Sequence, residues 1–325
     1  MATIYDVAKK VGLSVTTVSR VLNNRGYISE ATRKRVYETM EELNYQPNEL
    51  ARSLLRKQSN VLGLIIPDVA HPFFSELASH MEACAYASGY KILLCNSHLD
   101  PDKERDYIDM LKRNRVDGII MGSHTLEVDE YRTLQRPLVT IDRMIDASIP
   151  YIASDNYLGG RLATQLLLDK GCRKLAHICG NLALDLLANQ RDAAYVEAAA
   201  AGGVEALTYE TGTNVFDEGE YRELVKQLFA EHPEVDGIFA GSDLMAAFVL
   251  QECARRGRSV PDQVKLVGYD DVPMASWFVP SITSIRQPIR QMGELAVELL
   301  LKQLAGEEVP PATVLPVELM ERETT

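Results

Sequence analysis

The stretch TIYDVAKKVGLSVTTVSRVLN, residues 3–23, has the pattern of two short helices joined by a turn. Thr3 followed by Asp6 resembles a capping box, and apolar residues at helical spacing then run up to Gly12, near which the first helix should end. Ser14 can cap the second helix. Two short helices with a glycine in the turn between them predict a helix-turn-helix, whose second helix can lie in the major groove of DNA.

The second helix of this stretch has two different faces. Its apolar residues Val18, Val21 and Leu22 share one side, which can pack on a core. The opposite side presents hydroxyls and a cation: Thr16, Thr17, Ser19 and Arg20. Thr16 and Arg20 stand one turn apart, so both could reach base edges, and arginine offers a bidentate fork to guanine. The alternative is a surface helix whose polar side chains only meet water.

A third helix is expected after Ser29, because Val36, Met40 and Leu43 recur at positions i, i+4 and i+7 and can face the same small core.

The charge distribution also sets this end of the chain apart. Residues 1–60 carry ten Lys and Arg against six Asp and Glu, whereas the whole chain of 325 residues has a net charge of −12. A basic head on an acidic body indicates contact with a polyanion at one end, and the alternative is a chance fluctuation of charge.

Several classes of protein and site are not indicated. The five cysteines are scattered and never spaced as C-x-x-C, which predicts neither a disulfide framework nor a zinc knuckle but buried free thiols. The six histidines also lack ligand spacing. No apolar run approaches the roughly 20 residues of a membrane span, and the first residues do not form a secretory leader, so we expect a cytoplasmic protein. Nucleotide-binding and catalytic motifs are missing, so we expect no cofactor, no metal and no enzymatic activity.

The rest of the chain alternates apolar runs with amphipathic helical stretches. The runs include VLGLIIPD, YKILLCNS, DGIIMGS, PLVTID, KLAHICG, DGIFAGSD and VKLVGYDD. This alternation predicts parallel strands with crossover helices, and therefore α/β sheets covered on both faces. Ligands of such sheets collect outside the carboxyl ends of the strands. The polar strand ends are site candidates, or else simple turn and cap residues: Asp68, Asn96, Asp142, Ser242 and Asp270.

Two segments resemble the DNA-binding head of the lactose-repressor (LacI/GalR) family of bacterial transcriptional regulators. They are TIYDVAKKVGLSVTTVSRVLN and ISEATRKRVYETMEELNYQPNELARSLL. The likeness continues through most of the chain. It implies a homodimeric repressor of a carbohydrate-utilisation operon, which binds palindromic double-stranded operator DNA and responds to a small sugar effector. The alternatives are a corepressor-dependent regulator, or a solute-binding protein that does not bind DNA.

The resemblance also implies a domain organisation. It predicts a small all-α helix-turn-helix head at 1–46, a hinge helix and linker at 47–60, and an effector-binding and dimerisation body at 61–325. The body resembles type I periplasmic binding proteins, with two similar parallel-sheet α/β subdomains. We expect the first to span about 61–158 and 287–310, and the second about 159–286 and 311–325, with the chain re-crossing before the terminal strand, TVLPVEL.

Residues for DNA contact follow from the same resemblance. Positions 15, 16 and 20 read bases in the family, and Val15 could instead complete the core. A short hinge helix is unstable alone, so the family pairs two of them in the minor groove, where a leucine at the position of Leu54 wedges between base pairs. An ordinary linker is the alternative, and the effect of Leu55 is unassigned. The predicted DNA-binding set is Thr3, Ser14, Val15, Thr16, Thr17, Arg20, Asn23, Ala51 and Leu54.

The predicted effector site combines carboxylates, one arginine and aromatic rings. The segment NQRDAAY matches the family segment whose arginine clasps the effector, and the fork of Arg191 suits vicinal hydroxyls or a carboxylate. Because Asp185 and Leu187 stand where some relatives carry further basic or polar contacts, we expect a neutral sugar or glycoside rather than an anionic, purine-like effector. The predicted set is Phe73, Phe74, Asp142, Asp155, Arg191, Phe216, Ser242, Asp243 and Asp270.

Overall fold

The computed structural model describes residues 2–46, 58–123, 125, 131, 134, 136–212 and 217–325. The contacts within the chain separate a small unit, residues 1–59, from a larger unit, residues 60–325. Each unit is described by itself. The predicted hinge, with Ala51, Leu54 and Leu55, lies outside the described residues, as does Phe216.

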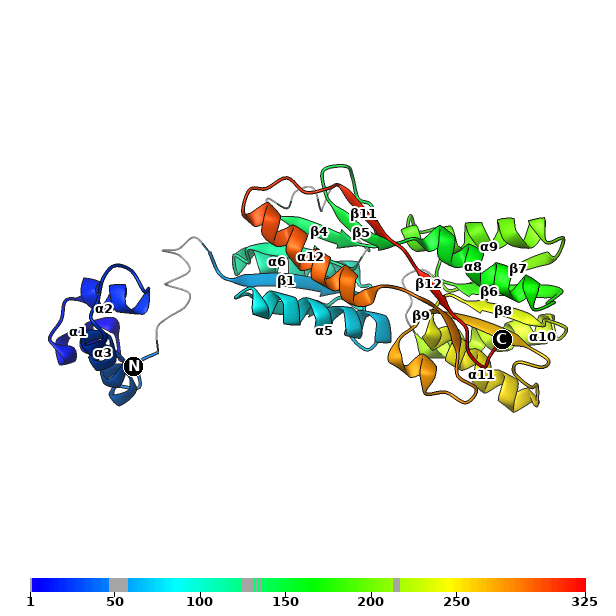
Figure 1. The fold of residues 1–325 in the computed structure, drawn as a ribbon, viewed down its shortest axis with the longest axis horizontal. Coiled ribbons are helices and arrows are strands. Elements are labelled where there is room, and N and C mark those ends of the chain that lie inside the picture. The colour runs from blue at the N-terminus through cyan, green and yellow to red at the C-terminus, as the bar shows by residue number, and fades with distance from the viewer. Residues whose placement is uncertain are drawn as a thin grey trace. The chain divides into compact units, whose positions relative to one another are not determined.

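The small unit contains the helices α1 (Ile4–Val11), α2 (Val15–Leu22) and α3 (Glu30–Glu42) (Figure 1). The predicted caps are confirmed. Thr3 and Asp6 form a reciprocal capping box, and Gly12 ends α1 with a φ of 70°, in the left-handed region that glycine adopts without strain. The hydroxyls of Ser14 and Ser29 accept hydrogen bonds from backbone amides in the first turns of α2 and α3. Apolar residues of all three helices form one small core.

The first sheet of the larger unit has the strand order β11-β5-β4-β3-β1-β2, with every pair parallel. Its strands are β1 (Val61–Ile66), β2 (Lys91–Asn96), β3 (Gly118–Met121), β4 (Leu138–Ile141), β5 (Tyr151–Ser154) and β11 (Ala312–Leu315). Helices α5 (Pro72–Ala87) and α12 (Ile289–Leu304) pack together over one face, and α6 (Pro101–Arg113) covers the other (Figure 1). Burial on both faces explains why β1 is a continuous apolar run.

The second sheet has the order β12-β10-β9-β8-β6-β7 and is parallel except for β12. Its strands are β6 (Lys174–Cys179), β7 (Glu205–Glu210), β8 (Gly237–Ala240), β9 (Lys265–Asp270), β10 (Thr283–Arg286) and β12 (Glu318–Met320). One face carries α10 (Glu218–Glu231) and α11 (Asp243–Arg256), and the other carries α8 (Asn156–Asp169) and α9 (Gln190–Ala201). Two short 3-10 helices, η1 (Leu187–Asn189) and η2 (Pro273–Ser276), lie in its loops. None of the helices in the described ranges has the length and apolarity that a membrane crossing requires.

Two similar parallel-sheet subdomains were predicted, and the structure confirms them with one correction. We expected residues 311–325 in the second subdomain, but β11 pairs with β5 in the first sheet and only β12 joins the second. The apolar pattern TVLPVEL suggested one terminal strand. It forms two, interrupted at Pro316, because proline cannot donate a ladder hydrogen bond and the chain passes there from one sheet to the other.

In each sheet one strand is flanked by the next two strands of the chain. β1 lies between β2 and β3, and β6 lies between β7 and β8. Such a reversal of strand order opens a crevice outside the carboxyl ends of the strands, where α/β proteins bind ligands. The fold therefore directs the search for a site to the loops that follow these strands.

Candidate functional site

The helix α2 presents an exposed polar side on the small unit. Thr16 and Arg20 are exposed, as the predicted base contacts require. Val15 is half-buried and packs against the core of the head, in agreement with the alternative that it completes this core. The hydroxyls of Thr17 and Ser14 lie 2.8 Å apart and share a hydrogen bond.

The other predicted contacts of the head hold the ends of helices. The hydroxyl of Thr3 caps α1, and the amide of Asn23 donates to the carbonyl of Ser19 at 2.8 Å at the end of α2. Thr16 and Arg20 are consequently the two predicted residues whose exposed side chains take no part in capping α1 or α2. They are the strongest candidates for reading a DNA sequence.

The larger unit encloses a cavity of about 170 Å³. One wall comes from the first sheet and its helix α5, and the other from loops and helix starts of the second sheet. Of the predicted effector residues, the structure brings the following to the cavity lining: Phe73, Phe74, Asp142, Arg191, Ser242 and Asp270. The two phenylalanine rings meet edge to face, with centroids 5.1 Å apart, and form an apolar corner.

The guanidinium of Arg191 is held on several sides. Nε donates to Oδ1 of Asn156 at 2.6 Å, Nη1 donates to the carbonyl of Gly241 at 3.1 Å, and Nη2 lies 3.8 Å from Oδ2 of Asp142. The guanidinium also lies over the ring of Tyr269, 3.5 Å from its centroid. These contacts fix the plane of the fork before any ligand binds.

Asp142, Asn156 and Arg191 form one hydrogen-bonded chain between the two subdomains. Asp142 follows β4 of the first sheet, and its Oδ1 accepts from Nδ2 of Asn156, at the start of α8, at 2.8 Å. Burial raises the pKa of Asp142, and the guanidinium of Arg191 opposes this increase. The carboxylate of Asp142 thus partly neutralises the arginine that a ligand would meet.

A second bridge between the subdomains runs through Gln287. Its Nε2 donates to Oδ1 of Asp270, at the end of β9, at 2.7 Å, and its Oε1 accepts from the hydroxyl of Ser154, at the end of β5, at 2.7 Å. Burial raises the pKa of Asp270 to about 7, while Arg191 and the hydrogen bond from Gln287 act to lower it. The backbone of Asp270 has a φ of 102°, a conformation that non-glycine residues rarely adopt.

Comparison with known proteins follows the division into two units. Residues 3–48 match the family described as bacterial regulatory proteins, lacI family, and residues 164–325 match the periplasmic binding protein-like domain. A ribose operon repressor of Halalkalibacterium halodurans is 40% identical over 328 residues, which cover 100% of this chain and 97% of that protein. A sucrose operon repressor of Streptococcus mutans is 37% identical, over 100% of this chain and 99% of the relative.

The chain belongs to the lacI family of bacterial regulatory proteins. Solved structures of similar proteins agree. The lac repressor dimer bound to operator and an anti-inducer matches with a TM-score of 0.86 and 26% identity, over 100% of this chain and 99% of that one. A periplasmic binding protein/LacI transcriptional regulator from Alkaliphilus metalliredigens, complexed with D-xylulofuranose, matches with a TM-score of 0.75 and 35% identity, over 82% of this chain and 99% of that one.

Two predicted effector residues are not among those that line the cavity of this lacI-family chain. The carboxylate of Asp155 caps α8 by accepting from the amide of Leu158 at 2.9 Å. Asp243 is fully buried at the start of α11, where it accepts from the hydroxyl of Ser284 at 2.6 Å and from the amide of Val272 at 2.9 Å. In this structure each of the two acids satisfies a nearby donor of the protein.

Several cavity residues were not predicted from the sequence. A loop rich in leucine contributes Leu182, Leu184 and Leu186, and its apolar residues in a turn region were the available signal. The polar residues not predicted are His71, His177, Asn181, Asn189, Asp192, Thr211 and Gln287. His177 lies within β6, and the others follow strands or lie at helix starts, as the predicted residues do, but no local pattern distinguishes them from ordinary strand and turn residues.

Proposed function

We propose that this chain is a transcriptional repressor of a carbohydrate-utilisation operon. It binds palindromic operator DNA as a homodimer, and a small sugar in the cavity of the larger unit sets its affinity for the operator. One observation carries this proposal: two features occur together in one lacI-family chain. The first is a helix-turn-helix with exposed Thr16 and Arg20, and the second is a cavity shared by two subdomains.

The charge of the cavity favours a neutral ligand. Among the lining residues that the structure describes, Arg191 is the only lysine or arginine, and the same lining contains three aspartates, Asp142, Asp192 and Asp270. The nearest acid already lies 3.8 Å from its guanidinium. A phosphate or carboxylate on the ligand would meet net negative charge, whereas hydroxyl groups can donate to carboxylates and accept from the guanidinium. The rings of Phe73 and Phe74 suit the apolar face of a sugar.

The two hydrogen-bonded bridges explain how a sugar can act at a distance. Both join the subdomains at the cavity lining, through Arg191 and Asp142 and through Gln287 and Asp270. A ligand that exchanges hydrogen bonds with these groups favours one arrangement of the subdomains over another. Coupling of this kind is typically worth about 1–3 kcal/mol.

The test begins with the protein selecting its own operator from a random pool of duplexes. Thermal-shift measurements then compare ribose, xylulose and sucrose with ribose 5-phosphate and hypoxanthine. We expect stabilisation by a neutral sugar that also changes retention of the palindromic duplex. Loss of retention identifies an inducer, and tighter retention identifies a corepressor. A protein that is strictly monomeric and retains no duplex would overturn the repressor proposal, and stabilisation by the phosphate or the purine alone would overturn the neutral-sugar proposal.

A further inference from the structure

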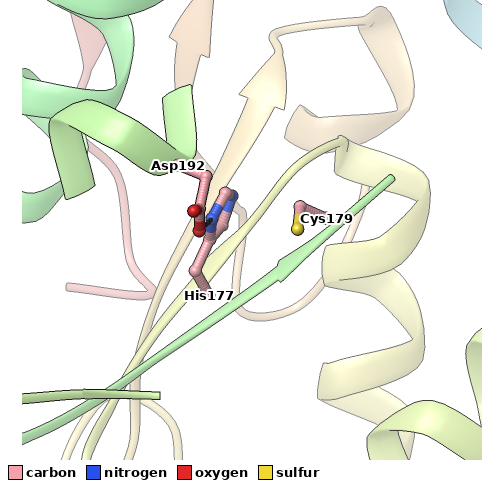
Figure 2. A group of neighbouring side chains, drawn as sticks. All are labelled: His177, Cys179 and Asp192. Atoms are coloured by element: carbon pink, nitrogen blue, oxygen red, sulfur yellow. Dashed lines mark hydrogen bonds and ion pairs between the residues drawn. The ribbon is translucent and has the colours of Figure 1, made fainter. Parts of the chain in front are cut away.

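Three side chains that can bind metal ions meet in the cavity lining of the second subdomain. His177 and Cys179 are alternate residues of β6, so their side chains leave the same face of the sheet. Asp192 comes from α9, which contacts β6. One donor atom of each residue lies within 4.8 Å of the other two (Figure 2). The proposed repressor function makes no use of the thiol.

The imidazole of His177 supplies a second, independent observation. Its side chain is 1% exposed, and its ring stacks on Phe239 with centroids 4.4 Å apart and an interplanar angle of 6°. Nδ1 lies 3.0 Å from Oδ1 of Asp192, while Nε2 is buried without a hydrogen-bond partner in the described residues. A buried polar atom without a partner costs free energy, so the unpaired Nε2 of His177 would gain from a bound ligand.

The separations are near those of a transition-metal site. Bond lengths of about 2.0–2.1 Å to nitrogen, 2.0–2.2 Å to oxygen and 2.3 Å to sulfur place tetrahedral zinc ligands roughly 3.3–3.7 Å apart. Nδ1 of His177 lies 3.0 Å from Oδ1 of Asp192, and one donor atom of each of the three residues lies within 4.8 Å of the other two. Because 4.8 Å is the upper limit of these separations, a contraction of at most roughly 1.5 Å would bring the three donors to the spacing of zinc ligands.

We propose that His177, Cys179 and Asp192 bind a first-row transition ion of the Zn²⁺ type. A nitrogen, a sulfur and an oxygen donor suit Zn²⁺ far better than Mg²⁺ or Ca²⁺, which prefer oxygen ligands alone. On binding, the thiol of Cys179 releases its proton to solvent and the thiolate forms a bond to the ion, while the imidazole binds as a neutral ligand. Three protein ligands leave a fourth position for water or for an oxygen atom of a cavity ligand.

The other thiols give the contrast that a test needs. Cys84, Cys95, Cys172 and Cys253 belong to no comparable group of ligands among the described residues. Cys84 is the only one of the five that is not fully buried. Adventitious binding of metal to a thiol would therefore occur first at Cys84, which makes Cys84→Ser the matched control for Cys179→Ser.

The experiment uses the full chain, stripped of metal by a chelator and kept reduced. We expect calorimetric titration with Zn²⁺ to show one ion per chain, and the Co²⁺ form to show a thiolate charge-transfer band in the near ultraviolet. Cys179→Ser, which is nearly isosteric, should lose this band and weaken Zn²⁺ binding at least about tenfold, and Asp192→Asn should weaken it as well. Cys84→Ser should bind both ions like the wild type.

Wild-type protein without the Co²⁺ band, or equal Zn²⁺ binding by the wild type and Cys179→Ser, would overturn the site. The thermal midpoint of each variant checks its fold, and the spectrum of the wild-type Co²⁺ form tests the proposal even if a variant unfolds. Operator retention is measured on the same preparations. If the protein binds the operator but no metal ion, only the metal site is overturned. If it binds the metal ion but no operator, only the repressor proposal is overturned.

Discussion

At the scale of single residues, Arg191 shows how the cavity is prepared for a ligand. Asn156, Gly241 and Asp142 surround the guanidinium, and Tyr269 supports its plane. A side chain already fixed in this way loses little conformational entropy when a ligand binds, which increases affinity. A lysine has one flexible ammonium group and cannot reproduce the planar fork.

We expect Arg191→Lys to weaken sugar binding by about 1.5–3 kcal/mol, the usual value of hydrogen bonds to a charged group. Calorimetry with the sugar identified by the thermal-shift panel measures the loss. Operator binding without sugar should be retained. Arg173→Lys, at an exposed position, is the control and should bind the sugar normally. Unchanged sugar affinity in Arg191→Lys would contradict a role of the fork in recognition.

Asp270 makes stability depend on pH. In the unfolded chain its carboxyl ionises near its ordinary pKa of 3.8, whereas burial raises the pKa of the folded form to about 7. Between about pH 4 and about pH 7 the unfolded chain has released a proton that the folded chain retains, so rising pH favours unfolding. Stability from this group is therefore greatest below about pH 4 and decreases up to about pH 7.

Asp270→Asn should make the thermal midpoint less sensitive to pH across this interval. Asparagine cannot ionise, and its Oδ1 can still accept from Gln287 as the aspartate does. Thermal unfolding of both proteins at several pH values measures the difference. Parallel curves for the mutant and the wild type would mean that the pKa of Asp270 is the same in the folded and the unfolded chain.

Arg20 tests the reading of DNA. Its exposed position on α2 allows a bidentate contact with guanine, so Arg20→Ala should weaken operator binding by about 1–3 kcal/mol per half-site. Fluorescence anisotropy with the selected operator and with a scrambled duplex measures the effect. The loss should be confined to the selected operator, and sugar binding should not change. An equal loss on both duplexes would show that Arg20 contacts only phosphates.

At the scale of elements, the contact between α8 and α9 positions the arginine. A Cβ atom at Gly160 would lie 2.3 Å from the carbonyl oxygen of Arg191 and 2.8 Å from its Cα, both backbone atoms. Glycine at this position therefore permits the two helices to approach closely. The distance between the helices determines where Arg191 enters the cavity.

Gly160→Ala should push α9 away from α8. We expect a loss of about 1–3 kcal/mol in the free energy of unfolding, as for other overpacked cores, together with weaker sugar binding. Chemical denaturation and calorimetry measure the two effects. Gln165→Ala, on the exposed side of the same helix, should change neither property by more than about 0.5 kcal/mol. A stable Gly160→Ala protein with normal sugar affinity would show that the helices can separate without moving the site.

Local signals predicted the elements better than the site. Capping residues and helical spacing located α1, α2 and α3, because each pattern acts within a few residues of its own position. The pairing of β11 with β5 depends on contacts between distant segments, so the pattern TVLPVEL could not predict it. Within the site, the structure places the acid of Asp142 in the cavity lining but not that of Asp243, because the direction of a side chain beside a helix start depends on donors from distant segments.

At the scale of the whole molecule, the two units make two kinds of binding separable. The proposed contacts with DNA lie in residues 1–59, and the cavity lies in residues 60–325. Each unit has its own core, so a substitution in one should leave binding by the other intact when that ligand is tested alone. Communication between them must then appear as a coupling free energy, which is a property of neither unit alone.

Coupling between two binding sites is reciprocal. If the sugar changes the affinity for the operator by some factor, the operator must change the affinity for the sugar by the same factor, and about 5–150-fold is typical. We expect calorimetric titrations of the sugar, with and without saturating operator, to give the factor that anisotropy gives for the operator. Arg20→Ala is the control. At a duplex concentration below the dissociation constant of this variant for the operator, the duplex should no longer change the affinity for the sugar. The contrary result would be a large apparent effect of the sugar on DNA retention, with a sugar affinity that saturating operator does not change. The sugar would then act on something other than the equilibrium between two states of this protein.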